Sequence, residues 1–190
     1  MKITSAKFIK GVVGEDQIFS DGIPQVAFLG RSNVGKSSLI NGLTNSKISR
    51  ESNFPGSTQE INVFLINKST YFVDLPGYGF TRVSGLGKQK IGDLITKYIF
   101  NPNFNQKKIV LIIDAKVGMT EQDIAVFEEL EKHKKDFIIV LSKIDKVNQS
   151  NFHHNLIEIK KITGEYPLFP CSSKTKKGLG PILQCILAKS

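Results

Sequence analysis

The chain has 190 residues, enough for one well-cored domain and too few for two typical ones. Its 40% hydrophobic and 23% charged residues are typical of a soluble globular protein, and its longest apolar runs are far shorter than the ~18 to 20 residues that cross a bilayer. The N-terminus does not resemble a signal peptide, so these features exclude a membrane-spanning chain and predict a cytoplasmic protein. The formal net charge of +9 favours a polyanionic partner.

Strand and helix patterns alternate along most of the chain. Apolar runs predict strands at 26–29, 61–65, 71–75, 109–113, 137–141 and 168–171, and the second and third of these form an antiparallel hairpin. Apolar residues three and four apart predict helices at 38–43, 91–99, 152–162 and 182–187, and a capping box of Thr120 with Asp123 starts another. We therefore predict an α/β domain over residues 23–190, a three-layer fold whose mostly parallel six-stranded sheet has one antiparallel edge strand and helices on both faces. Residues 1–22 are expected to form a short N-terminal extension packed on this domain.

A complete phosphate-binding loop, Gly30-Arg31-Ser32-Asn33-Val34-Gly35-Lys36-Ser37, lies between the first strand and the first helix. Its glycines permit a tight turn that brings backbone N–H groups toward one point, beside the partly positive N-terminus of the helix. Lys36 would reach the β and γ phosphates, and the hydroxyl of Ser37 would ligate Mg²⁺. The alternative is an ordinary glycine-bearing turn. We predict that residues 30–38, Ser38 included, bind a nucleoside triphosphate.

Two further segments are expected at the phosphates. Asp74-Leu75-Pro76-Gly77 ends a strand that follows the phosphate loop, the position expected for a carboxylate that holds Mg²⁺ and for a glycine whose N–H meets the γ phosphate, although alone it would be an ordinary turn. Between this motif and the phosphate loop, residues 49–58 show no periodicity. Thr58 is the candidate for a second hydroxyl on Mg²⁺, and a strand-edge threonine is the alternative. The predicted metal ligands are Ser37, Thr58 and Asp74.

Ser142-Lys143-Ile144-Asp145 follows another strand and has the chemistry to recognise guanine. A carboxylate at Asp145 can accept hydrogen bonds from N1–H and from the exocyclic amine, which adenine does not present on that edge, while the stem of Lys143 can lie over the ring. The Ser172-Ser173-Lys174 run follows the last predicted strand, where the backbone N–H of Ser173 could bond guanine O6.

With these motifs in order, the chain resembles the translation-factor class of small GTPases, and within it the EngB-type (YihA/YsxC) GTPases of ribosome biogenesis. The resemblance covers nearly the whole chain. It rests on Gly30 to Asn41, on Pro55-Gly56-Ser57-Thr58-Gln59-Glu60-Ile61-Asn62, on Asp74-Leu75-Pro76-Gly77-Tyr78-Gly79-Phe80 and on Ser142 to Asp145. It implies a P-loop GTPase domain that binds GTP or GDP with Mg²⁺ through these motifs, and a cytoplasmic protein that helps the large ribosomal subunit to mature. We expect the chain to be a monomer.

Hydrolysis is expected to be slow. Many signalling GTPases orient the attacking water with a Gln directly after the Asp-x-x-Gly motif, and here that position is Tyr78. Lys36 and Thr58 are the catalytic candidates at the phosphates. Asn33 is a third, because GTPases with this Asn suggest that it coordinates K⁺; the alternative is that Asn is simply tolerated at a turn position with unusual φ. The assembling ribosome could instead complete the site.

The positive charge is concentrated in two places. Six basic residues lie between Arg82 and Lys108 against Asp93 alone, and Lys174, Lys176 and Lys177 form a second cluster. We expect a partner such as rRNA on the 82–108 surface, although lysines on a solvated helix face are the alternative. Two other functions stay open: a GTP-sensing, RNA-docking module with negligible catalysis, and an ATP-using P-loop phosphotransferase.

Overall fold

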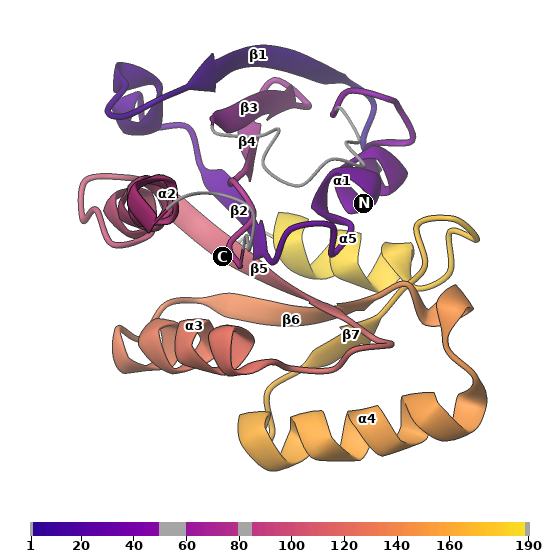
Figure 1. The fold of residues 1–190 in the computed structure, drawn as a ribbon. Helices are drawn as coiled ribbons and strands as arrows, with labels where there is room; N and C mark the ends of the chain where they lie inside the picture. Colours follow the sequence, from indigo (N-terminus) through magenta and orange to yellow (C-terminus); the bar gives the residue numbers. More distant parts are fainter. Residues whose placement is uncertain (1, 50–59, 80–84, 189–190) are drawn as a thin grey trace.

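The computed structural model describes residues 2–49, 60–79 and 85–188, which form one seven-stranded sheet in the order β1-β3-β4-β2-β5-β6-β7 with helices on both faces (Figure 1). The strands are β1 (Ala6–Val12), β2 (Gln25–Gly30), β3 (Ile61–Ile66), β4 (Thr70–Asp74), β5 (Gln106–Asp114), β6 (Phe137–Ser142) and β7 (Leu168–Pro170). The helices are α1 (Lys36–Thr44), α2 (Gly85–Ile99), α3 (Glu121–Lys132), α4 (Gln149–Thr163) and α5 (Leu179–Leu187), with short 3-10 turns η1 (Gln17–Ser20) and η2 (Ile144–Lys146).

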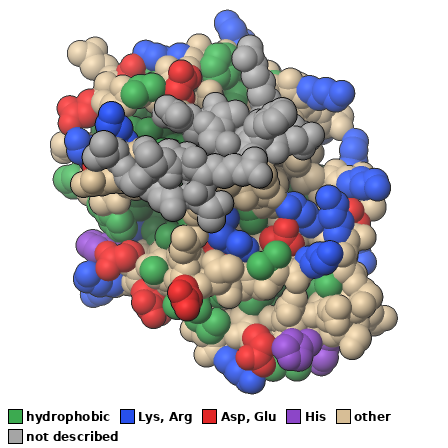
Figure 2. All heavy atoms as spheres, in the orientation of Figure 1, with side chains coloured by type: hydrophobic (Ala, Val, Ile, Leu, Met, Phe, Trp, Pro, Cys, Tyr) green, Lys and Arg blue, Asp and Glu red, His purple; other side chains and the backbone are tan. Residues whose placement is uncertain are grey.

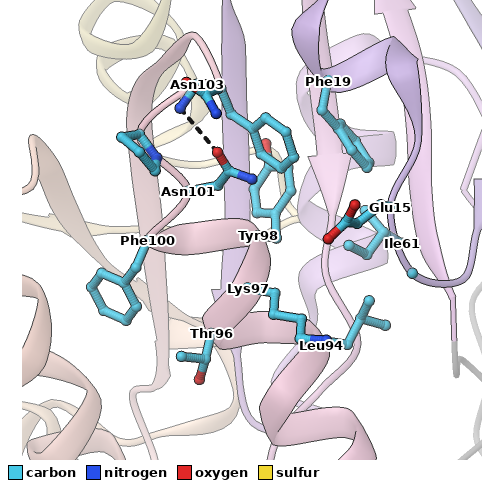
Figure 3. Close-up of a pocket in the computed structure, with 13 residues that line it drawn as sticks. Glu15, Phe19, Ile61, Leu94, Thr96, Lys97, Tyr98, Phe100, Asn101 and Asn103 are labelled. Carbon is cyan, nitrogen blue, oxygen red and sulfur yellow. Dashed lines mark hydrogen bonds between the residues drawn. The ribbon is translucent and has the colours of Figure 1, made fainter.

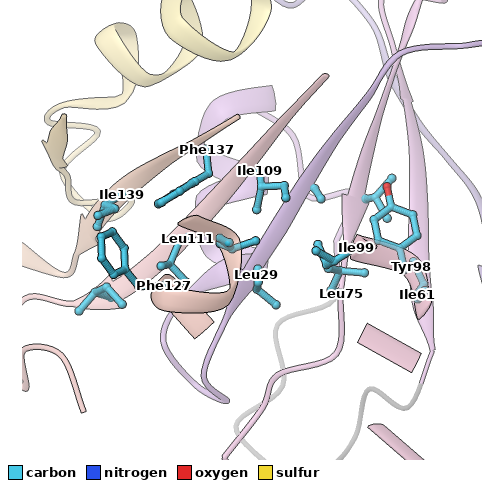
Figure 4. Close-up of a cluster of buried hydrophobic side chains, with 14 of the residues drawn as sticks. Leu29, Ile61, Leu75, Tyr98, Ile99, Ile109, Leu111, Phe127, Phe137 and Ile139 are labelled. Carbon is cyan, nitrogen blue, oxygen red and sulfur yellow. The ribbon is translucent and has the colours of Figure 1, made fainter. Parts of the chain in front are cut away.

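Alternation along the central strands assigns each side chain to one of two cores. In β2, Ala27 and Leu29 face a cluster completed by α2, α3 and α4, whereas Val26 and Phe28 face a cluster completed by α1 and α5. Figure 4 shows the first cluster, in which Phe127 of α3 packs on the strands. Both faces are covered because a parallel sheet is apolar on both sides. The predicted three-layer α/β fold is confirmed.

The predicted count of six strands is wrong, because β1 adds a seventh. It comes from the segment that we expected to be an extension, and it pairs antiparallel with β3, as β3 does with β4 in the predicted hairpin. Phe8 lies opposite Phe64 in this pairing, with the ring centroids 5.6 Å apart. Most β1 side chains are exposed and only Val12 is buried, so the segment has no alternation that would predict a strand.

Aromatic packing attaches the segment after β1 to the rest of the domain. Phe19 of η1 packs edge-on against Tyr98 of α2, with centroids 5.0 Å apart, and Phe104 completes the group. The Tyr98 hydroxyl donates to the side chain of Gln25, which in turn donates to the Phe19 carbonyl, both at 2.7 Å. A hollow of about 390 Å³ opens beside this group (Figure 3), lined also by Glu15, Leu94, Lys97 and Asn101.

The predicted capping box of Thr120 with Asp123 is confirmed at the start of α3. Cys171 and Cys185 are free thiols, the first buried and the second half-buried. Among the described helices none combines the length and the apolar character that a membrane span requires.

Candidate functional site

The phosphate loop connects β2 to α1 in the expected way. Gly35 adopts φ 102° at the N-cap of α1, a left-handed conformation that suits glycine, and Asn33 adopts φ 60°. A side chain at Gly30 would place its Cβ 2.7 Å from the carbonyl oxygen of Ile112, so the start of the loop must be glycine. Buried Leu39 and Ile40 fix α1 on the sheet, which directs its N-terminus at the loop.

Asp74 lies at the end of β4 beside the first turn of α1. The hydroxyls of Ser37 and Ser49 both donate to its Oδ2 at 3.1 Å. Burial raises the pKa of this carboxyl, while the Lys36 ammonium and the two hydroxyls act in the opposite direction. Burial likewise lowers the pKa of Lys36, and the charge of Asp74 counteracts the shift.

The other oxygen of Asp74, Oδ1, is buried and has no hydrogen-bond partner among the described residues. A buried carboxylate oxygen needs a donor or a cation, and Mg²⁺ prefers the carboxylate and hydroxyl oxygens found here. The donor set therefore fits Mg²⁺ at Ser37 and Asp74. The third predicted ligand, Thr58, lies outside the described residues, as do Pro55, Gly56 and Ser57.

Gly77 packs directly on the phosphate loop. A Cβ at Gly77 would lie 2.6 Å from the Ser32 hydroxyl oxygen and 2.8 Å from the Ser32 Cα, so a larger residue would separate the two segments. The next residue, Tyr78, accepts a hydrogen bond from the Ser32 N–H at 3.0 Å and forms an isolated bridge with Arg31. Asp74-Leu75-Pro76-Gly77 and the phosphate loop therefore lie together, as predicted.

The guanine motif is tied to the same loop. The Ser142 hydroxyl donates to the Val34 carbonyl at 2.7 Å. Lys143 adopts φ 59°, and its ammonium lies 2.5 Å from the Asn33 carbonyl and 2.8 Å from Oδ2 of Asp114. The lysine stem therefore reaches from the guanine motif to the phosphate loop.

Asp145 and the Ser172-Ser173-Lys174 run also meet. Asp145 is exposed on η2, and a hydrogen bond from the Ser172 hydroxyl, with the charge of Lys174 adding to it, holds the pKa of its carboxyl below the usual value. Ser173 packs beside α1, because a Cβ at Gly42 would lie 3.6 Å from the Ser173 Cβ. The ionised carboxylate that guanine recognition requires is therefore available at the surface.

Three residues of this region were not predicted as site residues. Ser49 contacts Asp74, Asp114 binds Lys143, and Asp123 was expected only as a helix cap, although its carboxylate also binds Tyr78 and lies 2.9 Å from Arg31 Nε. Asp114 ends β5 directly opposite Ser142 in the sheet register. A carboxylate ending the neighbouring parallel strand was the available signal for it, because such strand ends meet at one edge.

Comparison with known proteins identifies the family. A family model described as a 50S ribosome-binding GTPase matches residues 25–143, and one described as the elongation factor Tu GTP binding domain matches residues 106–189. The "Probable GTP-binding protein EngB" of Clostridium perfringens (strain SM101 / Type A) is 40% identical over 182 residues, which cover 94% of this chain and 92% of that protein. The chain belongs to the EngB family of GTP-binding proteins.

Further EngB relatives and solved structures agree. EngB of Petrotoga mobilis is 39% identical over 189 residues, which cover 98% of this chain and 96% of that protein. A crystal structure of a probable GTP-binding protein engB has a TM-score of 0.71 and 26% identity, covering 87% of this chain and 100% of that chain. Era in complex with MgGDPNP and nucleotides 1506–1542 of 16S ribosomal RNA has a TM-score of 0.70 and 25% identity, covering 87% of this chain and 56% of that chain.

Proposed function

We propose that this EngB-family chain binds Mg²⁺ with GTP or GDP, hydrolyses GTP slowly, and uses the two nucleotide states as a switch in the assembly of the large ribosomal subunit in the cytoplasm. One observation carries the nucleotide part of the proposal. Asp74 Oδ1, a buried oxygen without a partner among the described residues, lies at the phosphate loop at the end of β4. The ionised carboxylate of Asp145 follows the end of β6, which runs parallel to β4 in the same sheet with β2 and β5 between them. Metal, phosphate and guanine chemistry therefore share one edge of the sheet.

The environment of Tyr78 supports slow hydrolysis. Its hydroxyl donates to the buried carboxylate of Asp123 at 2.8 Å, and it has no amide with which to orient water. Each tenfold of rate that is missing corresponds to about 1.4 kcal/mol of transition-state stabilisation. Under the proposal, K⁺ at the exposed Asn33 or a contact with the ribosome supplies it. A steep rise in turnover when K⁺ replaces Na⁺ would support the first source, and no change would remove it.

The exposed lysines that the structure describes in both basic clusters support an RNA partner. In the first, Lys107 contacts the carbonyl of Ala188 and Lys108 pairs with Asp136 at 2.5 Å, while Lys90 and Lys97 are exposed. Figure 2 shows Lys and Arg side chains at the right-hand edge of the molecule, where Figure 1 places the end of α1 and the loop before α5. The exposed residues of the second cluster are Lys174, Lys176 and Lys177.

Co-sedimentation with purified large ribosomal subunits tests the assembly role. We expect the protein to sediment with the subunits in GTP and to stay in the supernatant in GDP or without nucleotide. Lys174→Glu with Lys177→Glu, and separately Lys90→Glu with Lys97→Glu, should weaken the association and make its salt dependence shallower without changing nucleotide affinity. Equal co-sedimentation in GTP, in GDP and without nucleotide would contradict the switch. GTP turnover that stays negligible in the presence of the subunits would favour a GTP-sensing module without catalysis.

A further inference from the structure

Three segments of the site meet at one buried carboxylate. Oδ1 of Asp123 accepts a hydrogen bond from the Tyr78 hydroxyl at 2.8 Å, and Oδ2 lies 2.9 Å from Nε of Arg31. Tyr78 directly follows Gly77, Arg31 belongs to the phosphate loop, and Asp123 lies in the first turn of α3. Burial raises the pKa of the Tyr78 phenol well above its usual value, so its hydroxyl stays a donor.

Asp123 is itself held in place from α3. The N–H and the hydroxyl of Thr120 donate to its Oδ2 at 2.9 and 2.8 Å, and the side chain is fully buried. The capping box requires only one of these bonds from the carboxylate, the one that accepts from the Thr120 N–H, and a single oxygen supplies it. The second oxygen is committed to Tyr78, and a buried charge paired in this way resists displacement because breaking one contact leaves it uncompensated.

The contacts among Arg31, Tyr78 and Asp123 fix the position of Gly77. The Ser32 N–H holds the Tyr78 carbonyl, and the Asp123 carboxylate holds the Tyr78 ring, so both the backbone and the side chain of the residue after Gly77 are fixed. Gly79 also packs closely on α3, since a Cβ added at this position would lie 2.5 Å from the side chain of Gln122. The position of the Gly77 N–H, the group expected at the γ phosphate, therefore depends on α3 as well as on the phosphate loop.

We propose that Asp123 is a positioning residue for γ-phosphate recognition: through Tyr78 and Arg31 it holds Gly77 against the phosphate loop, and so it sets the preference for GTP over GDP. This inference rests on the proposed function, because it assumes that the chain binds both nucleotides. It assigns Tyr78, which stands where other GTPases have a water-orienting Gln, the role of an anchor.

The test compares the affinities for GDP and for a non-hydrolysable GTP analogue, each with Mg²⁺, in variants that fold. Tyr78→Phe removes one hydroxyl and leaves the ring. We expect it to reduce the ratio of GTP-analogue affinity to GDP affinity about tenfold, as expected for losing a hydrogen bond to a charged group, while GDP affinity stays within about twofold. Asp123→Asn should lower the same ratio at least as far. Tyr71→Phe is the matched control, because the Tyr71 hydroxyl likewise donates to a carboxylate, that of Asp21, at 2.8 Å.

The possible results are separable. Unchanged ratios in both variants would overturn the inference, and so would an equal loss of both nucleotides, because that would show a merely structural role. If Asp123→Asn does not fold, Tyr78→Phe decides alone, since it removes only the hydroxyl. Wild-type protein that binds neither nucleotide would instead reject the proposed function. A reduced ratio in the variants, with Tyr71→Phe unchanged, would establish Asp123 as the positioning residue.

Discussion

The ammonium of Lys143 and the carboxylate of Asp114 lie 2.8 Å apart and join the ends of two neighbouring parallel strands. Lys143 belongs to the guanine motif and directly follows β6, and Asp114 is the last residue of β5. The pair is partly buried, with side-chain exposures of 27% and 14%, so solvent screens it less than a surface ion pair. Asp114 thus fixes the direction of the lysine stem that is expected to cover the base.

Replacing Asp114 by Asn should weaken both guanine nucleotides equally. The amide keeps the oxygen that accepts from the Lys116 N–H at 2.9 Å, but it loses the charge that holds Lys143. We expect GDP and GTP affinities each to fall about fivefold, or roughly 1 kcal/mol, in a calorimetric titration. Asp136→Asn is the control, because its pair with Lys108 lies at the opposite end of the strands. Unaltered affinity in Asp114→Asn would show that Lys143 needs no such support.

Asp145→Asn should exchange the base preference. Its carboxylate is the acceptor for the two donors of guanine, and an amide presents one donor in their place, which suits the additional oxygen of xanthine. We expect GTP affinity to fall on the order of a hundredfold or more and xanthosine nucleotides to bind in its place, measured by competition against a fluorescent nucleotide. Unchanged GTP affinity would reject Asp145 as the group that reads the base.

Ser37→Ala should make nucleotide binding insensitive to magnesium. The wild-type protein is expected to lose triphosphate affinity when EDTA removes Mg²⁺, because the hydroxyl of Ser37 and Asp74 Oδ1 would hold the ion. In the variant the affinity should already be low and should change little on chelation. Ser69→Ala, in the exposed β3–β4 turn, should behave as the wild type. A full magnesium response in Ser37→Ala would contradict the assigned ligand.

Stability should decline in alkali because two buried groups hold their protons in the folded state. Burial first, and then the Asp21 carboxylate, raise the pKa of Tyr71 from 10.0 to about 12; burial first, and then the charge of Asp145, raise the pKa of Cys171 from 9.0 to about 12. The unfolded chain releases these protons earlier, so the contribution is complete below about pH 9 and is lost as the pH rises toward 12.

Urea unfolding at several values between pH 8 and pH 11 measures this loss. Tyr71→Phe removes the tyrosine share, so its free energy of unfolding should fall less steeply with pH than that of the wild type. Tyr78 and Tyr98, whose phenol pKa values burial also raises, contribute in the same direction in both proteins. Identical slopes for the variant and the wild type would mean that Tyr71 does not couple to folding.

Much of this fold follows from local signals. Continuous apolar runs in the central strands and apolar residues three and four apart in the helices predicted the layers, because burial on both faces of a parallel sheet leaves such runs in the sequence. Strand β1 gave no such signal, since an edge strand makes its backbone pairs while most of its side chains stay in solvent. Its pairing with β3 depends on residues far along the chain.

The residues of the site also differ in how far the sequence predicted them. The phosphate loop and Asp145 were predictable because consecutive residues carry their chemistry. Asp123 showed only its capping role, since its other contacts, with Tyr78 and Arg31, come from distant segments that the fold brings together. Asp114 gave a partial signal through its place at a strand end. Contacts between segments, more than the motifs themselves, are what the structure adds.

The pairing of β1 with β3 also covers a sheet edge through which copies of the chain could join. Without the first dozen residues, β3 would present an unpaired backbone edge carrying the apolar Phe64 and Ile66, which is a template for joining another copy. With them, the outermost strand displays Lys7 and Lys10, whose charges discourage such joining. An N-terminal truncation should therefore promote the formation of intermolecular sheets.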